Sequence, residues 1–204
     1  MGERGQSVDA VAVRGKGRRK QVLDTAVDLL ASGGERAMTF HGVDDAAGVP
    51  RGSTSNHFRT RDALRVGVCA EVLTRRAGVF IASAWPNGTG NPHTVRELTA
   101  SLSGYVLDAT DASMTATGAV ARAHLSLVVL AQVHPELRQM LAASDLRLQH
   151  VLHTARCVIN PAALAWHTEM ITDYLTGVIT TQISAPREKF NPRPGIAVQL
   201  AATC

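Results

Sequence analysis

Residues 39–64, TFHGVDDAAGVPRGSTSNHFRTRDAL, constrain the fold more than any other stretch of this 204-residue chain. Thr39 offers a hydroxyl that can cap the N-terminus of a helix. Apolar residues follow at helical spacing, at Phe40, Val43 and Ala47. Gly48 suits the left-handed backbone of a sharp reversal, Val49 is expected to be buried at this pivot, and Pro50 fits the first turn of a new helix. The stretch therefore predicts a helix, a glycine turn and a second short helix.

The second helix of this pair carries polar side chains where a buried helix would carry leucines. Its residues are Arg51, Gly52, Ser53, Thr54, Ser55, Asn56 and His57. Phe58 then closes the segment with an apolar ring that can pack against neighbouring helices. Because a helix this short and polar gains little from its own burial, we expect its neighbours to hold it at the surface and present it to a polar partner. The major groove of DNA is the obvious partner for a helix-turn-helix.

The same residues resemble the DNA-binding domain of the tetracycline-repressor (TetR) family of bacterial regulators. The positions that follow the family pattern without a gap are Thr39, Val43, Ala47, Gly48, Val49, Gly52, His57, Phe58, Arg61 and Leu64. The resemblance covers roughly the first quarter to third of the chain, and beyond it only the helical layout is similar. Two departures stand out: Thr54-Ser55 replaces the usual Leu-Tyr, and Arg61 replaces a frequent lysine. Arg61 keeps the charge, whereas Ser55 loses a DNA contact that the tyrosine commonly makes.

The resemblance implies an all-α protein with two parts. These are an N-terminal three-helix helix-turn-helix domain over 18–62 and a C-terminal helical ligand-binding and dimerisation domain over 63–185. It also implies a homodimeric transcriptional regulator, expected to be a repressor, that a small-molecule effector releases from a palindromic operator in double-stranded DNA. Base-edge contacts are expected from Arg51, Ser53, Ser55 and Asn56, with Gly52 beside them. Phosphate contacts are expected from Thr39, His57 and Arg61.

Basic residues gather before the first predicted helix, although the formal net charge of the whole chain is only +4. One run without acidic residues holds Arg14, Lys16, Arg18, Arg19 and Lys20. Beside a helix-turn-helix, such a run favours phosphate contacts, because each neutralised phosphate releases counterions. Residues 1–17 are therefore predicted to form a flexible basic arm. A solvated leader without a role is the alternative.

Helical periodicity runs through nearly the whole chain, and no segment sustains the alternation of a β-strand. The expected helices span 18–31, 61–84, 95–110, 116–133, 135–157 and 161–184. Breakers at 85–94 predict a loop, and residues 186–204 are expected to form an irregular tail. The helix at 61–84 would leave the DNA-binding domain and enter the second domain. It is therefore expected to be the mechanical link between them.

The two apolar helices at 135–157 and 161–184 have two possible roles. They can pair with a copy of themselves in a symmetric four-helix seam, or they can complete the core of the monomer. In the family, such a seam sets the distance between the recognition helices, which must match about one turn of B-DNA, roughly 34–36 Å. Leu148 fits either role.

The second domain is expected to enclose a chamber for a largely apolar effector. Candidate lining residues are large or adaptable side chains, namely Tyr105, Met114, His124, Leu125, Val129, Met140, Trp166, Met170 and Tyr174. Packing in the core is the alternative role for each of them. No sequence feature names the effector, and a DNA-binding protein that senses no ligand is the alternative function.

No catalytic residue, metal site or cofactor is predicted. The chain contains no GxSxG, Walker or glycine-rich dinucleotide-binding pattern. An all-helical enzyme that uses His124 or His134 is the weaker alternative. His150, His153 and His167 could approach one another, but no carboxylate or thiolate is spaced to complete a metal site with them.

The cysteines and the apolar segments bear on the environment of the protein. Cys69, Cys157 and Cys204 are widely separated and have no CxxC spacing, so we expect free thiols. A redox-sensing role for one of them stays open. The apolar run at 125–133 is far too short to span a bilayer, and no signal-peptide pattern is present. We therefore expect a cytoplasmic protein.

Overall fold

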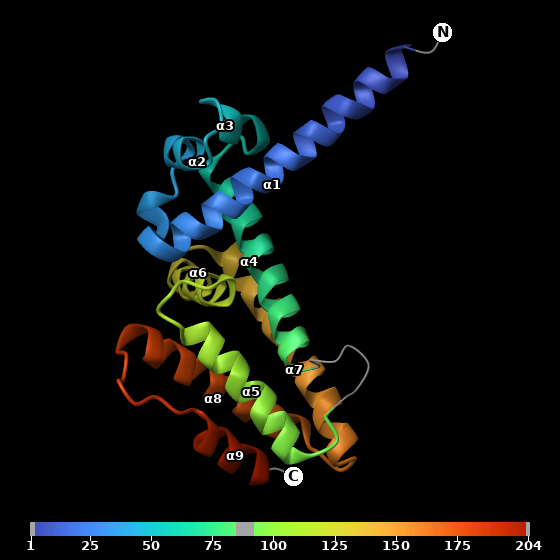
Figure 1. The fold of residues 1–204 in the computed structure, drawn as a ribbon, viewed down its shortest axis with the longest axis vertical. Helices are drawn as coiled ribbons and strands as arrows, with labels where there is room; N and C mark the ends of the chain where they lie inside the picture. Colours follow the sequence, from blue (N-terminus) through green and yellow to red (C-terminus); the bar gives the residue numbers. More distant parts are fainter. Residues whose placement is uncertain (1–2, 85–91, 203–204) are drawn as a thin grey trace.

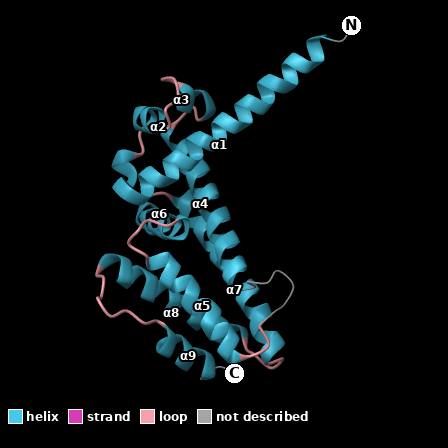
Figure 2. Ribbon diagram, in the orientation of Figure 1, coloured by secondary structure: helices cyan, strands magenta, loops and turns pink. Residues whose placement is uncertain are grey.

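The structure is a computed structural model that describes residues 3–84 and 92–202. Within these ranges every regular element is an α-helix (Figure 2), which confirms the all-α prediction. The helices are α1 (Glu3–Ala37), α2 (Phe40–Ala46), α3 (Ser53–His57), α4 (Arg61–Ala84), α5 (Val95–Thr110), α6 (Ala116–Leu130), α7 (Pro135–Ile159), α8 (Ala165–Ser184) and α9 (Arg193–Ala201). Figure 1 shows α2 and α3 at one end of the molecule, α9 at the other, and α4 running between. Most of the predicted loop at 85–94 lies outside the described residues.

Helix α1 is longer than predicted. It begins at Glu3 instead of Arg18, so the segment expected to be a flexible arm continues the helix away from the rest of the molecule (Figure 1). This segment contains no proline, and extending an existing helix adds a hydrogen bond per residue without a new nucleus. The predicted stop at Gly33 and Gly34 is a break: Gly34 has φ 65° and ψ −164°, and the helical assignment resumes as far as Ala37.

A first hydrophobic core joins the helix-turn-helix to α4, α6 and α7. The predicted stripe of α1 is buried in it, with exposures of 4% or less at Leu23, Ala26, Val27 and Leu30. Helix α6 lies directly against α1 and contributes Val120, Ala123 and Leu127 to the same core. The hydroxyl of Ser126 also donates a hydrogen bond of 3.3 Å to the carbonyl of Leu30. The two predicted domains therefore share one core across the α1–α6 contact.

A second hydrophobic core fills the opposite end of the molecule, between α5, α7, α8, α9 and the last turns of α4. The predicted stripe of α5 is buried here, at Leu98, Leu102, Tyr105, Val106 and Ala109. Helix α4 belongs to both cores, because Leu64 and Val68 lie in the first and Phe80 lies in the second. This arrangement supports the link role that the sequence predicts for α4.

The prediction of an irregular tail over residues 186–204 is wrong for α9. Ile196 and Leu200 are fully buried and pack with α5 and α8 in the second core. Their spacing of four places both on one face of a helix, a short period that the three prolines at 186–194 obscured in the sequence. Gly195 lies close to Tyr174, and a Cβ there would collide with the hydroxyl of Tyr174 unless that side chain moved.

Helices α7 and α8 form an antiparallel pair whose turn is fixed by a buried arginine. Pro135 opens α7 as predicted, whereas Pro161 lies in the turn and α8 begins only at Ala165. Arg156 is fully buried and donates hydrogen bonds to the carbonyl of Leu164 at 3.2 Å and to Oγ1 of Thr168 at 2.7 Å. The predicted helix at 116–133 also ends early, because α6 stops at Leu130 and a turn follows.

Candidate DNA-binding surface and ligand cavity

The predicted helix, glycine turn and second helix are present between Thr39 and His57. The hydroxyl of Thr39 accepts a hydrogen bond of 3.0 Å from the backbone N–H of Gly42, so Thr39 caps α2 as expected. Gly48 has φ 62°, the left-handed conformation that the turn requires. Val43 is fully buried, whereas Val49 is only half-buried.

Asp44 ties the second helix to the first, a role that the sequence reasoning missed. Its carboxylate accepts hydrogen bonds from the backbone N–H of Gly52 at 2.7 Å and from the N–H and hydroxyl of Thr54 at 2.8 and 2.6 Å. Asp44 and Thr54 are both fully buried. Since α3 has only five residues and no side-chain cap of its own, this carboxylate anchors the start of the helix from outside.

The hydrogen bonds also set the charge state of Asp44. Burial raises the pKa of this carboxyl group, but the hydrogen bonds from Thr54 and Gly52 outweigh burial, and the pKa lies below its ordinary value of 3.8. Asp44 is therefore ionised at neutral pH. An ionised acceptor forms stronger hydrogen bonds than a neutral one, which tightens the connection between α2 and α3.

Phe58 closes the segment against α4 and α1. Its ring is 4% exposed and lies against Gly67, where a Cβ would come within 2.5 Å of the ring atom Cε1. The guanidinium of Arg19 lies 5.1 Å from the centre of the same ring. Arg19 is one of the basic residues singled out in the sequence. The basic part of α1 therefore lies beside the end of α3.

The structure places most of the predicted DNA-binding residues at the surface. Arg51 has a side chain that is 77% exposed, and the other exposed residues of the set are Thr39, Asn56 and Arg61. Gly52, Ser55 and His57 are half-buried. The Ser55 hydroxyl donates a hydrogen bond of 3.0 Å to the carbonyl of Gly52, the residue that precedes α3.

Ser53 does not lie on the exposed side of α3, and this part of the prediction is wrong. The residue is only 7% exposed. Its hydroxyl donates a short hydrogen bond of 2.6 Å to the carbonyl of Pro50, which holds the side chain against the turn. Ser53 therefore stabilises the entry to α3 and is not available to a base edge.

A cavity of about 160 Å³ lies in the second domain. Five helices line it, namely α4, α5, α6, α7 and α8. Its apolar wall includes Val79, Phe80, Leu148 and Ile179. The rings of Phe80 and Tyr105 meet edge to face, with centroids 5.3 Å apart and planes at 89°. The sequence predicts a chamber in this part of the chain, and the structure has a cavity there, to which α8 contributes a large share of the lining.

Polar side chains also contribute to the lining of this cavity. Nη1 of Arg76 donates a hydrogen bond of 2.6 Å to Asp145 and pairs α4 with α7. Burial raises the pKa of Tyr105, and the nearby Arg76 partly offsets that effect. Burial, with a smaller contribution from the charge of Arg76, lowers the pKa of His124 to about 3. Both side chains are therefore uncharged at neutral pH.

Only three of the predicted chamber residues line the cavity, namely Tyr105, His124 and Leu125. The others lie outside the cavity. Val129, Trp166, Met170 and Met114 are exposed by 65%, 55%, 48% and 39%. Met140 packs against the first core, and Tyr174 lines a separate hollow beside α9. The lining prediction is wrong for these six residues.

Sequence reasoning also missed the polar lining. The missed residues include Arg76, Asp145, Gln149, Thr172, Thr176 and Thr180. The three threonines recur at intervals of four on α8, so they share one face of that helix. This regular spacing was the signal in the sequence.

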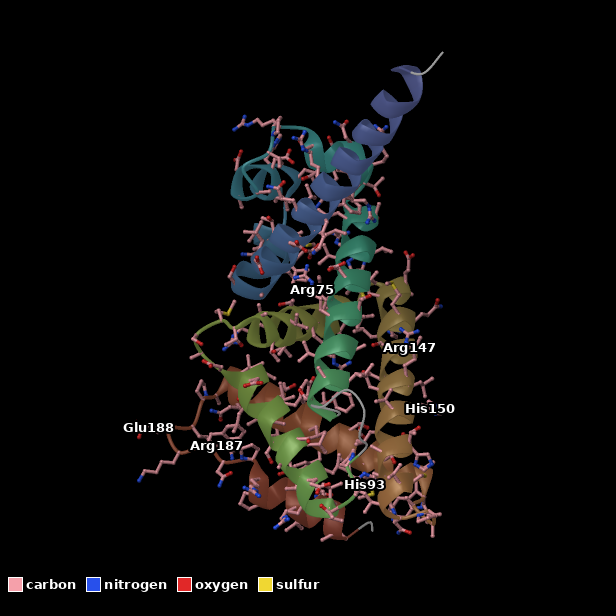
Figure 3. The ribbon with its side chains drawn as sticks, turned by 45° about the vertical axis from the view of Figure 1, so that its right-hand side comes forward. Arg75, His93, Arg147, His150, Arg187 and Glu188 are labelled. Carbon is pink, nitrogen blue, oxygen red and sulfur yellow. The ribbon has the colours of Figure 1, made fainter. Side chains whose placement is uncertain are left out.

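The sequence raised the possibility that His150, His153 and His167 approach one another as metal ligands. Among the described residues, no three His, Cys, Asp or Glu side chains are grouped to hold a metal ion. Figure 3 shows His150 and Arg147 on the outer side of α7. Nδ1 of His153 lies 3.2 Å from the hydroxyl of Thr168, within the α7–α8 pair. No helix in the described part of the chain is both long and apolar enough to cross a membrane.

The chain matches no protein-family model and no curated protein. Solved structures do match. A candidate TetR-family transcriptional regulator from Rhodococcus sp. has a TM-score of 0.72 at 18% identity, covering 92% of this chain and 98% of that one. A TetR-family member from Streptomyces coelicolor A3 gives 0.63 at 19% identity, over 91% and 96%.

Two further matches were solved with small molecules. The multidrug binding protein EbrR, complexed with ethidium, gives a TM-score of 0.67 at 18% identity, over 91% of this chain and 97% of that one. A candidate transcriptional regulator from Saccharomonospora viridis, in complex with choline, gives 0.69 at 13% identity, over 92% and 94%. This protein therefore has the fold of the TetR-family transcriptional regulators.

Proposed function

We propose that the protein is a sequence-specific DNA-binding transcriptional regulator, a repressor that a small-molecule effector releases from a palindromic operator. The observation that carries this proposal is the helix-turn-helix with its exposed polar residues, joined through shared helices to a cavity with open polar groups. Neighbours of the same fold hold ethidium and choline, which supports a ligand role for the cavity. A packed second domain without a cavity would have favoured the alternative, a DNA-binding protein that binds no small-molecule effector.

A homodimer is part of the proposal. Large apolar side chains are exposed on α7, α8 and the turn between them, at Leu146, Val158, Leu164, Trp166 and Met170. Exposed apolar residues in such number on two adjacent helices favour coverage by a partner. A second copy related by a two-fold axis would cover them and would set two α3 helices about one turn of DNA apart, roughly 34–36 Å.

Helices α4 and α6 supply the proposed coupling between ligand and DNA. Leu64 of α4 lies in the first core and Arg76 lines the cavity, roughly 18 Å further along the helix at 1.5 Å per residue. On α6, Ala123 is buried in the first core and the adjacent His124 faces the cavity. A ligand that binds better when these helices are displaced would favour a conformer that no longer fits two successive grooves.

Selection from a random pool of duplexes tests the DNA-binding function. We expect a two-fold symmetric site bound by two protomers. The logarithm of the affinity should fall linearly with the logarithm of salt concentration, because each phosphate contact releases counterions. Analytical ultracentrifugation of the complex gives the stoichiometry, and fluorescence anisotropy gives the salt slope. A site without symmetry, or an affinity that does not respond to salt, would exclude the proposed function.

The two exposed arginines of the helix-turn-helix are expected to contribute differently. Arg51→Ala should relax the preference at one base pair of each half-site and weaken operator binding by about 1–3 kcal/mol, since a base-edge contact is lost. Arg61→Ala should weaken all duplexes alike, because a phosphate contact carries no sequence information. Anisotropy titrations against the selected site and against point variants of it measure both effects. Equal, sequence-independent losses from the two substitutions would contradict this division.

A further inference from the structure

We infer that the effector is an uncharged molecule with an apolar body of about one ring and a hydroxyl group, and that this hydroxyl bonds to Nε2 of His124. This ligand class depends on the sensing function proposed above and specifies it further. Three features of the cavity lead to it: an unpaired imidazole nitrogen, a balanced ion pair and a small apolar volume.

The imidazole of His124 lines the cavity and carries an unsatisfied nitrogen, which a rotation of the ring would bring to a ligand. Its Nε2 atom is buried and has no hydrogen-bond partner among the residues that the structure describes. A buried polar atom without a partner is unfavourable, so a ligand group that satisfies it gains affinity that an apolar group does not. Because a hydroxyl both donates and accepts, it fits either tautomer of the neutral ring.

The ion pair beside the cavity disfavours a charged ligand. Arg76 is 13% exposed and its charge is balanced by Asp145, with which it forms the 2.6 Å hydrogen bond. A carboxylate ligand would therefore compete with Asp145 and leave one negative charge without compensation, and an ammonium ligand would bring a second positive charge close to Arg76. Either arrangement is costly at Arg76, which is largely shielded from water, and less costly at Asp145, whose side chain is 49% exposed. The remaining charged lining residue, Asp173, is exposed and screened by solvent.

The size and lining of the cavity set the body of the ligand. A volume of about 160 Å³ is close to that of an engineered protein cavity, about 150 Å³, that takes up benzene. Phe80 and Leu125 provide apolar surface near Tyr105 and His124. A single aromatic ring or an aliphatic body of the same size therefore fits, with its hydroxyl directed at the imidazole.

Four probes of matched shape separate the possible chemistries on the intact protein. Para-cresol carries the hydroxyl, para-xylene replaces it with a methyl group, para-toluate carries a negative charge and para-methylbenzylamine a positive one. Calorimetric titration at neutral pH should show para-cresol binding about tenfold more tightly than para-xylene, the effect of one buried hydrogen bond. The two charged probes should bind more weakly than para-cresol.

Two substitutions of His124 then test whether this residue causes the preference for para-cresol over para-xylene. His124→Phe keeps an aromatic ring without the nitrogen and should reduce the ratio of para-cresol to para-xylene affinity to about one. His124→Gln keeps a hydrogen-bonding group and should preserve part of the preference. Equal binding of the two neutral probes to the wild type, tighter binding of either charged probe, or no binding of any probe would overturn the ligand class, and these outcomes need no variant.

A DNA-release assay separates this ligand class from the proposed function. If para-cresol binds with the His124-dependent preference but leaves the operator complex intact, the assignment of the ligand class is supported. The proposal that this ligand releases the protein from its operator is then excluded. If release occurs equally with para-xylene and para-cresol, sensing stands and the hydroxyl assignment is wrong.

Discussion

Asp44→Ala is expected to abolish operator binding and to lower the free energy of unfolding by about 3 kcal/mol. The substitution leaves the N–H groups of Gly52 and Thr54 and the hydroxyl of Thr54 without their acceptor in a buried place. With its anchor lost, the five-residue α3 has too few internal hydrogen bonds to hold its shape. Chemical denaturation and an anisotropy titration with the selected operator measure the two effects.

The matched control is Asp28→Ala, which removes an exposed carboxylate from α1 and should change both quantities little. The pH dependence provides a second readout. Because the pKa of Asp44 is lowered in the folded protein, its contribution is present above its ordinary value of 3.8 and is lost as the pH falls below it. The difference in stability between wild type and Asp44→Ala should therefore narrow below about pH 4. Operator affinity within twofold of wild type in Asp44→Ala would contradict the anchoring role.

Leu125→Trp is expected to abolish release of the operator by the effector, while operator affinity stays within about threefold of wild type. The larger indole occupies the cavity of about 160 Å³ from the α6 side, so a ligand of one ring no longer fits. Calorimetry with para-cresol should show at least a tenfold loss of affinity. An anisotropy assay on the preformed operator complex measures release.

Val129→Trp adds the same bulk to the same helix at a residue that is 65% exposed, and it should leave both ligand binding and release unchanged. The pair therefore distinguishes filling of the cavity from a general effect of tryptophan on α6. Normal release in Leu125→Trp would show that the effector binds elsewhere, and loss of release in both variants would show a general effect on α6.

Local features of the fold could be read from the sequence, because single residues dictate them. Thr39 marked a helix start and Gly48 a turn, and the structure has both. Which residues line a cavity is a different matter, since it depends on how five helices pack against one another along their lengths. Leu125 and Val129 lie one turn apart on α6, yet Leu125 lines the cavity and Val129 is exposed.

The buried anchor of α3 was missed for a related reason. Asp44 and Asp45 are adjacent, and both would be expected to face solvent because they are acidic. In the structure Asp44 is buried and Asp45 is exposed. The signal lay ten residues away in Thr54, which occupies a position where the family usually has leucine. A hydroxyl at a buried position requires a buried partner, and an acidic residue on the preceding helix can supply it. The pairing is nonlocal, so neither residue indicates it alone.

The direct packing of α1 on α6 limits how far the DNA-binding part can be exchanged as a module. A chimera that joined residues 1–62 of another regulator to the remainder of this chain would place foreign side chains against Val120, Ala123 and Leu127. The new surface would have to match this face of α6, and a mismatch would move the helix that also carries His124 and Leu125 into the cavity. If the proposed function is correct, a swap of residues 1–62 without repacking of this contact would alter the response to the effector as well as the preference for DNA.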